Sequence, residues 1–123
     1  METIMVVDDE TLIRRLITQS LEKEGYAVLG ARCGERGVQC FEEHPDEIEL
    51  VLTDVAMPNM SGPEMVDRIL QLKASIKVLF MTGYDAPTGL PTLRQQQFGV
   101  LLKPFTQAAL VRRVRECLDE NCL

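Results

Sequence analysis

Carboxylate, hydroxyl and lysine side chains each follow an apolar run in this chain, and together they could bind a metal ion and a phosphoryl group. Asp8 and Asp9 end the run TIMVVDD, and Asp54 ends the run LVLTD. Thr82 and Lys103 follow two later runs, VLFM and GVLL. Carboxylate oxygens are ligands that suit Mg²⁺, and a carboxylate can also attack phosphorus as a nucleophile. A lysine and a hydroxyl can hold the oxygens of a phosphoryl group during its transfer.

Each of these signals also has an ordinary structural explanation when it is taken alone. An acidic pair after a strand often forms a turn or caps a helix, and Thr82-Gly83 and Lys103-Pro104 are typical of turns. Polar residues directly after each of four separate apolar runs are much harder to explain by chance. The joint pattern favours one shared site, in which three carboxylates would need a cation to offset their mutual repulsion.

Such a site needs a fold that brings distant segments together, and alternating apolar runs and amphipathic segments predict one. The predicted strands cover 3–9, 26–31, 50–54, 77–83 and 99–103. The predicted helices cover 11–24, 34–43, 62–73 and a last segment, capped by Thr106, that runs to about 119. Because the strands are apolar throughout, helices must cover both faces of their sheet, which implies a parallel sheet. The carboxyl ends of parallel strands share one edge, so the polar residues should converge there.

The apolar residues of the predicted helices recur at the three- and four-residue spacing of a buried helix face. In chain order they are Leu12, Ile13, Leu16, Ile17 and Leu21, then Val38 and Phe41, then Met65, Val66, Ile69 and Leu72, and finally Leu110, Val111, Val114 and Leu118. The stretch 85–98 differs, because Pro87, Gly89 and Pro91 leave only 92–97 with helical promise. We find no linker or repeat and predict one domain over 1–123.

Composition narrows the kinds of protein that fit this chain. Its 123 residues, with 46% hydrophobic residues and a net charge of −6, suit a globular domain. The acidic balance argues against a nucleic-acid-binding surface, and no apolar stretch is long enough to cross a bilayer. The four cysteines form no CxxC pair, so we expect reduced thiols in a cytoplasmic protein.

Four stretches resemble the receiver domain of two-component response regulators, and the resemblance covers essentially the whole chain. They are VVDDE at 6–10, LVLTDVAMPNMSG at 50–62, VLFMTGY at 78–84 and LLKPF at 101–105. The resemblance implies a flavodoxin-like, doubly wound α/β fold with a five-stranded parallel sheet in the order 2-1-3-4-5. It also implies about five helices, the fourth of them short or irregular. Within the family, the chain looks most like the receiver modules of hybrid sensor histidine kinases.

The resemblance assigns a role to each acid of the predicted site. Asp54 would accept a phosphoryl group from a phosphohistidine. Asp9 would bind Mg²⁺ directly and Asp8 mainly through water. Asp54 itself and the backbone carbonyl of Ala56 would complete the protein ligands of the metal.

The resemblance also gives roles to Thr82 and Lys103, which would hold the phosphoryl oxygens by a hydroxyl hydrogen bond and an ion pair. The peptide bond between Lys103 and Pro104 is expected to be cis. Two departures concern the signal that leaves the site. Val100 stands where the family often has a Tyr or Phe that turns inward when the threonine moves, and 85–98 stands where the family has its fourth helix. We therefore do not expect a switch through an aromatic ring at 100 or output through an ordinary fourth-helix surface.

The predicted function is a phosphoacceptor signalling domain that switches conformation in a Mg²⁺-dependent two-component phosphorelay, as part of or partner to a hybrid histidine kinase. As an isolated domain it would not be an enzyme, although it would catalyse its own phosphorylation and dephosphorylation. Its expected partner is a histidine kinase or a histidine phosphotransfer protein. We expect no nucleic acid, no membrane contact and at most a weak homodimer.

Three other functions fit parts of the pattern. A phosphatase of the haloacid-dehalogenase type also uses a strand-end aspartate, but it needs a second acid where this chain has Ala56, and a cap insertion. A nucleotide-binding flavodoxin-like domain would need a glycine-rich phosphate loop after the first strand. A pseudo-receiver that is never phosphorylated and acts as a protein-binding module remains the alternative, and a lack of Mg²⁺ affinity would favour it.

Overall fold

The computed structural model of the chain describes residues 1–83 and 98–119. Its strands are β1 (Thr3–Val7), β2 (Ala27–Ala31), β3 (Ile48–Asp54), β4 (Lys77–Thr82) and β5 (Gly99–Leu102). Its helices are α1 (Thr11–Lys23), α2 (Gly34–Glu43), α3 (Gly62–Leu72) and α5 (Gln107–Asp119). Each lies where the apolar pattern predicts it, with ends that differ by a few residues. The predicted irregular fourth helix falls almost wholly on 84–97, outside the described residues.

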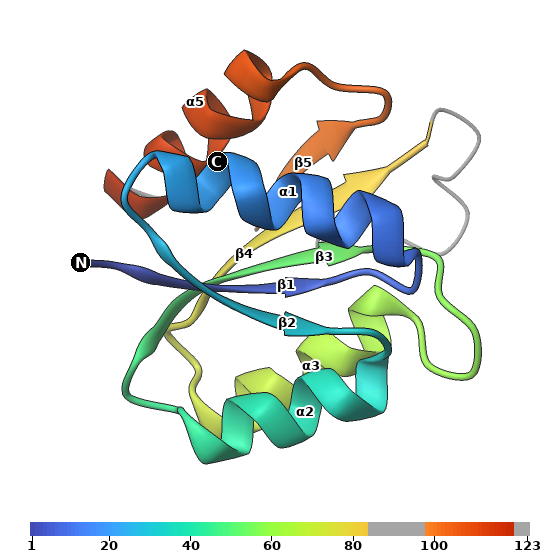
Figure 1. The fold of residues 1–123 in the computed structure, drawn as a ribbon. Coiled ribbons are helices and arrows are strands. Elements are labelled where there is room, and N and C mark those ends of the chain that lie inside the picture. The colour runs from blue at the N-terminus through green and yellow to red at the C-terminus, as the bar shows by residue number, and fades with distance from the viewer. Residues whose placement is uncertain (84–97, 120–123) are drawn as a thin grey trace.

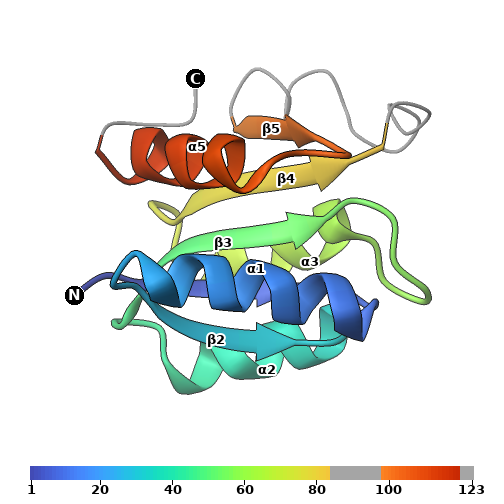
Figure 2. The same cartoon turned by 45° about the horizontal axis from the view of Figure 1, so that its top comes forward.

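The five strands form one parallel sheet in the order β2-β1-β3-β4-β5, which confirms the predicted flavodoxin-like arrangement. Helices α1 and α5 cover one face of the sheet, and α2 and α3 cover the other (Figure 1). All strands run in the same direction, so their carboxyl ends share one edge (Figure 2). The chain turns to opposite sides of the sheet after β1 and after β3. Ligands bind at such a switch point in open α/β sheets.

The sheet is buried on both faces, which explains why its strands are apolar throughout. Met5, Val7 and Val51 belong to the hydrophobic cluster that includes residues of α2 and α3. Ile4 and Leu52 belong to the cluster that includes residues of α1 and α5. Alternate side chains of one strand therefore enter different layers of the core, and these layers hold the strand ends in place.

The predicted helix faces are correct in part. In α1, Ile17 and Leu21 are buried, whereas Leu12 and Leu16 are 69% and 52% exposed. Neighbouring positions on a helix differ by about 100°, so Leu12 and Leu16 lie well round from the face that Ile17 presents to the sheet. Leu72, the last residue of α3, is 49% exposed. The spacing predicts an apolar stripe wider than the surface that the sheet covers.

The prediction of reduced cysteines is correct for Cys33 and Cys40 and wrong for Cys117. Cys33 and Cys40 are free thiols, but Cys117, which is fully buried in α5, is disulfide-bonded. The CxxC pattern gives no sign of this bond because Cys117 has no other cysteine at that spacing. Within the described part of the chain, no helix is long and apolar enough to cross a membrane.

Candidate functional site

Asp54 is the last residue of β3 and stands at the carboxyl edge of the sheet, with 8% of its surface exposed. Its backbone is held on several sides. The Thr53 hydroxyl donates to the carbonyl oxygen of Asp54 at 3.0 Å. Just beyond it, the Val55 N–H donates to the carbonyl oxygen of Met81 at 3.0 Å and continues the pairing with β4. The carboxylate is thus carried by a rigid strand end.

Gly62, the first residue of α3, packs directly against the backbone of Asp54. A Cβ atom at this position would collide with the Asp54 carbonyl oxygen. The Gly62 N–H also donates to the Val55 carbonyl oxygen at 2.8 Å. Ser61 and Glu64 form a capping box that begins α3 at this point. The loop after β3 can therefore fold back tightly only because residue 62 lacks a side chain.

Asp8 and Asp9 follow β1, and their environments differ. Asp8 is fully buried, and its Oδ1 accepts a hydrogen bond from the Glu10 N–H at 2.9 Å. The carbonyl oxygen of Asp8 accepts one from Arg14 Nη1 at 2.7 Å. Asp9 is exposed. One acid is thus fixed in the protein, while its neighbour faces solvent.

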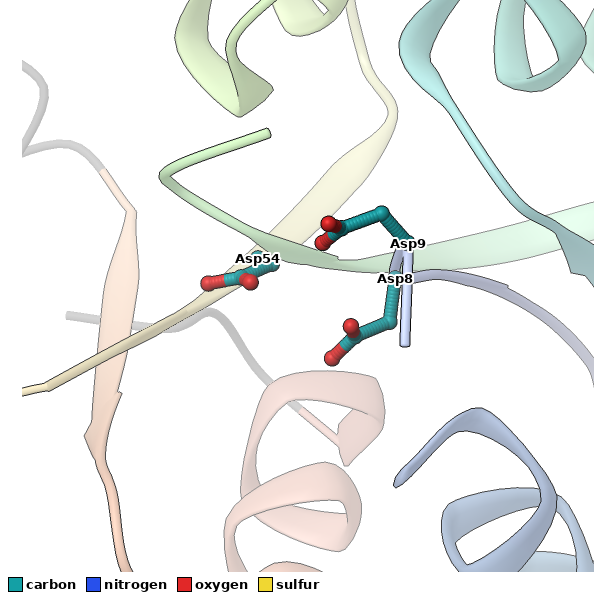
Figure 3. Close-up of side chains that lie close together, drawn as sticks. All are labelled: Asp8, Asp9 and Asp54. Carbon is teal, nitrogen blue, oxygen red and sulfur yellow. The ribbon is translucent and has the colours of Figure 1, made fainter. Parts of the chain in front are cut away.

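The carboxyl groups of Asp8, Asp9 and Asp54 converge at this edge. Each offers one oxygen such that all three oxygens lie within 4.8 Å of one another. Figure 3 shows the side chains of Asp8 and Asp9 leaving the end of β1 and reaching toward Asp54. Hard oxygen donors at this spacing, one of them open to solvent, suit a divalent cation that keeps part of its water shell. The site therefore fits Mg²⁺.

Lys103 follows β5 and brings a positive charge to the acids. Its Nζ lies 3.3 Å from Asp54 Oδ2 and 3.5 Å from Asp8 Oδ2. The Lys103 N–H donates to the Thr82 carbonyl oxygen at 2.7 Å, and the peptide bond to Pro104 is cis as predicted. Burial lowers the pKa of Lys103, but the charges of Asp54 and Asp8 outweigh it, so the pKa is raised overall. Lys103 therefore stays charged near neutral pH.

The pKa of Asp54 is raised above its ordinary value of 3.8. Burial is the main cause, and the nearby negative charge of Asp8 adds to it, while Lys103 acts in the opposite direction. The lysine thus offsets only part of the cost of holding this carboxylate in its ionised form. A divalent cation would offset more.

The remaining predicted site residues, Thr82 and Ala56, lie at the same edge. Thr82 ends β4 and is 5% exposed, and its hydroxyl donates to the Gly83 carbonyl oxygen at 3.2 Å. Ala56 is exposed in the loop after β3. Val100 lies in β5, paired with Phe80, and packs against the cluster on the α2 and α3 side. The structure thus gathers the predicted site residues at one edge and brings Asp8, Asp9, Asp54 and Lys103 into a single cluster.

Two contacts at the site go beyond what the sequence predicts. One is the hydrogen bond from Arg14 to the Asp8 carbonyl oxygen. The helical pattern places Arg14 on the polar face of the first helix, and nothing in the sequence distinguishes it from its neighbour Arg15. Gly62 has the sequence context of a turn residue, whereas its role here is a close approach to Asp54. The position of Gly62, just after a predicted strand and loop, is the only signal of that role in the sequence.

The sequence model of the response regulator receiver domain matches residues 4–115. The chain belongs to this family. The receiver-domain assignment from the four sequence stretches is therefore confirmed, and with it the place of the chain in two-component signalling.

Relatives of this receiver domain include both long and short proteins. The sensor kinase CckA of Brucella abortus (strain 2308) is 34% identical over 122 residues, which are 97% of this chain but 13% of CckA. The response regulator receiver protein CpdR of the same organism is 32% identical over 119 residues, 96% of this chain and 98% of CpdR. The chain therefore spans a small part of one relative and nearly all of the other.

Solved structures give the same fold. A response regulator receiver domain protein from Clostridium thermocellum superimposes with a TM-score of 0.89 at 28% identity, covering 97% of this chain and 95% of that one. The receiver domain of the hybrid histidine kinase CckA superimposes with a TM-score of 0.81 at 29% identity, covering 94% and 98%. The predicted similarity to receiver modules of hybrid kinases is thus found in both sequence and structure.

Proposed function

We propose that this receiver domain accepts a phosphoryl group on Asp54 from a phosphohistidine, in a Mg²⁺-dependent phosphorelay. The observation that carries the proposal is the cluster at the carboxyl edge. A buried carboxylate ends a rigid strand, a lysine lies 3.3 Å away, and two further acids converge on it. Asp8, Asp9, Asp54 and the carbonyl of Ala56 would hold the metal.

In the transfer, a carboxylate oxygen of Asp54 attacks the phosphorus of the donor. An O–P bond forms while the P–N bond to the donor imidazole breaks, and the imidazole nitrogen keeps the electron pair and takes up a proton. Lys103 forms an ion pair with the transferred oxygens and holds them in line with the attack. Mg²⁺, when bound, supplies charge neutralisation that lets two groups of like charge approach each other.

The products of this step define the switch and its reset. The acylphosphate on Asp54 presents new acceptor oxygens, to which Thr82 turns its hydroxyl from its present partner at Gly83. That rotation shifts the populations of the loops after β3 and β4. Water then hydrolyses the acylphosphate. Phosphorylation modifies the domain itself and hydrolysis restores it, so the domain catalyses its own phosphorylation and dephosphorylation and in isolation is a phosphoprotein and not an enzyme.

A histidine kinase or a histidine phosphotransfer protein is the proposed partner, in the cytoplasm. An apolar groove of about 750 Å³ begins beside Lys103 and runs along α1 and α5, with Ile13, Leu16 and Phe105 among its lining residues. Because Lys103 belongs to both the groove and the acid cluster, a protein seated on the groove would bring its phosphohistidine to Asp54. The similarity to CckA and CpdR supports either a module of a hybrid kinase or a separate regulator.

A phosphodonor experiment tests the proposal. The wild-type protein is incubated with acetyl phosphate and Mg²⁺, and intact-mass spectrometry measures the phosphorylated fraction. Wild type should gain one phosphoryl group, and Asp54→Asn should gain none. Asp46→Asn, which changes an exposed aspartate in the loop after α2, is the matched control and should behave like wild type.

Two outcomes would reject it. If wild type gains no phosphate, or if Asp54→Asn gains as much as wild type, Asp54 is not the acceptor. A wild-type protein that neither gains phosphate nor binds Mg²⁺ would instead favour the protein-binding pseudo-receiver.

A further inference from the structure

Arg14 makes an unexpected contact with the site. It lies in the first turns of α1, and its Nη1 donates a hydrogen bond of 2.7 Å to the carbonyl oxygen of Asp8. Hydrogen bonds from a charged donor are short and strong. Arg15, the next residue, is exposed, and no such contact of its side chain is found in the described part of the chain. Two adjacent arginines therefore occupy different environments.

The path of the Arg14 side chain links three elements. From α1 it crosses the edge strand β2 at Gly30, where a Cβ atom would lie 3.6 Å from Arg14 Cδ. It then reaches Asp8, which follows β1. On the other side of that residue, the Asp8 N–H donates to the Ala31 carbonyl oxygen at 3.2 Å. Both peptide groups of Asp8 are thus held, one by β2 and the other by Arg14.

The backbone of Asp8 determines where its carboxylate points. The side chain is fully buried, its Oδ1 accepts from the Glu10 N–H, and its Oδ2 faces Lys103 Nζ. These contacts keep the carboxyl group in place relative to the short turn between β1 and α1. The orientation of that turn then sets the distance from Asp8 and Asp9 to Asp54.

We infer that Arg14 is a positioning residue, which fixes the turn of Asp8 and Asp9 so that the metal site is preformed. The inference rests on the Mg²⁺ site proposed above. Partners that orient metal ligands from behind typically change metal affinity by about 10- to 100-fold when they are removed. Arg14 would thus act on the affinity for Mg²⁺ and not on the transferred group.

A simple charge effect predicts the opposite sign. Arg14 carries a positive charge close to a cation site, so its removal should tighten Mg²⁺ binding by relieving repulsion. Removal of a positioning contact should weaken Mg²⁺ binding despite that relief. The direction of the change in affinity therefore separates the two explanations.

The test is a calorimetric titration of metal-free protein with Mg²⁺, without any phosphodonor. Arg14→Met keeps the apolar cover over Gly30 and removes the donor and the charge, and its Mg²⁺ dissociation constant should rise by about tenfold. Arg15→Met removes the same charge from the same helix and should bind Mg²⁺ as tightly as wild type or slightly more tightly. Arg14→Lys keeps the charge but not the planar donor group, and its affinity should lie between those of wild type and Arg14→Met.

Each result decides the matter. An Arg14→Met protein that binds Mg²⁺ as tightly as wild type, or more tightly, overturns the inference while leaving the metal site intact. If Arg14→Met does not fold in a urea titration, Arg14→Lys decides alone, with weaker binding supporting the inference and wild-type binding overturning it. If wild type itself binds no Mg²⁺, the metal site of the proposed function fails and the inference fails with it.

Discussion

Charged side chains gather at both edges of the sheet, but the two groups are built differently. At the carboxyl edge, three carboxylates converge with Lys103. At the amino edge, Arg115 of α5 donates two hydrogen bonds of 2.9 Å to the carboxylate of Glu2. The same guanidinium donates to Asp119 at 2.9 Å and to the Tyr26 hydroxyl at 3.1 Å. Both edges thus join distant parts of the chain by charge.

The difference lies in how fully the charges are matched and how far they are buried. The Arg115 side chain is 42% exposed and its donors point at acceptors, so this group is satisfied without any ligand. Asp8 and Asp54 are both buried beside a single lysine, and burial raises the pKa of Asp54, so the ionised form of Asp54 is destabilised in the metal-free fold. A fully paired cluster stabilises a structure. A buried cluster with unmatched charge is arranged for a ligand.

The largest expected effect is at the carboxyl edge and comes from the loss of the Lys103 charge. Lys103→Met should reduce phosphorylation of Asp54 by acetyl phosphate by about 100-fold, because one preorganised charge on the transferring group is lost. The initial rate of phosphorylation, followed by intact mass at saturating Mg²⁺, measures the change.

Lys77→Met is the matched control for that change. Lys77 Nζ donates to the Leu118 carbonyl oxygen at 2.6 Å, near the end of α5 and away from the acids. Its loss should lower the free energy of unfolding by about 1 kcal/mol and leave the phosphorylation rate unchanged. Equal losses of rate in both variants would show that stability, and not the position of Lys103, controls the reaction.

The carboxyl edge is the part of this contrast that the sequence predicts well. The strands and the meeting of Asp8, Asp54 and Lys103 follow from apolar runs that end in polar residues, whereas the sheet order follows from the resemblance to receiver domains. The side-chain pattern along a strand and the crossover rules of parallel sheets act over short distances and leave few arrangements open.

The features that the sequence does not predict depend on contacts between segments. Arg14 and Arg15 have the same local sequence pattern, and only the place of β2 beside α1 decides which of them reaches Asp8. Leu16 fits a helix stripe, yet it lies round the helix from the face that packs on the sheet. Likewise, Gly62 looks like a turn residue until the Asp54 carbonyl is placed against it. Such contacts are set by packing between segments, and one sequence gives at most a positional signal of them.

A second prediction concerns how much the buried negative charge of Asp54 destabilises the metal-free fold. Because the pKa of Asp54 is raised in the folded state, this carboxyl binds a proton more tightly folded than unfolded. Its charge therefore destabilises the fold above the raised pKa, and this cost disappears as pH falls below the ordinary value of 3.8. Metal-free Asp54→Asn should therefore be more stable than wild type at neutral pH, and the difference should disappear in acid. Urea unfolding at several pH values measures the difference.

The same comparison with Mg²⁺ present sharpens the prediction. Ligand binding to the folded state alone adds stability to wild type, so the advantage of Asp54→Asn should shrink or reverse as Mg²⁺ is added. If Asp54→Asn is less stable than wild type in metal-free buffer at neutral pH, the positive charge of Lys103 already compensates the negative charges of the acids.

The smallest expected effect is at the amino edge, where the sign of the pH dependence should be opposite. The hydrogen bonds from Arg115 lower the pKa of Glu2 below its ordinary value of 4.5. A lowered carboxyl pKa contributes stability that is present above the ordinary value and is lost as pH falls through the lowered one. Arg115→Met should thus unfold at a slightly lower urea concentration at neutral pH, and the deficit should fade in acid and in high salt, which screens exposed pairs.

Arg112→Met, on the exposed side of the same helix, should match wild type throughout. Because no metal is expected at this edge, Mg²⁺ should not change the deficit, and a deficit that depends on Mg²⁺ would mean that the two edges are coupled through the sheet.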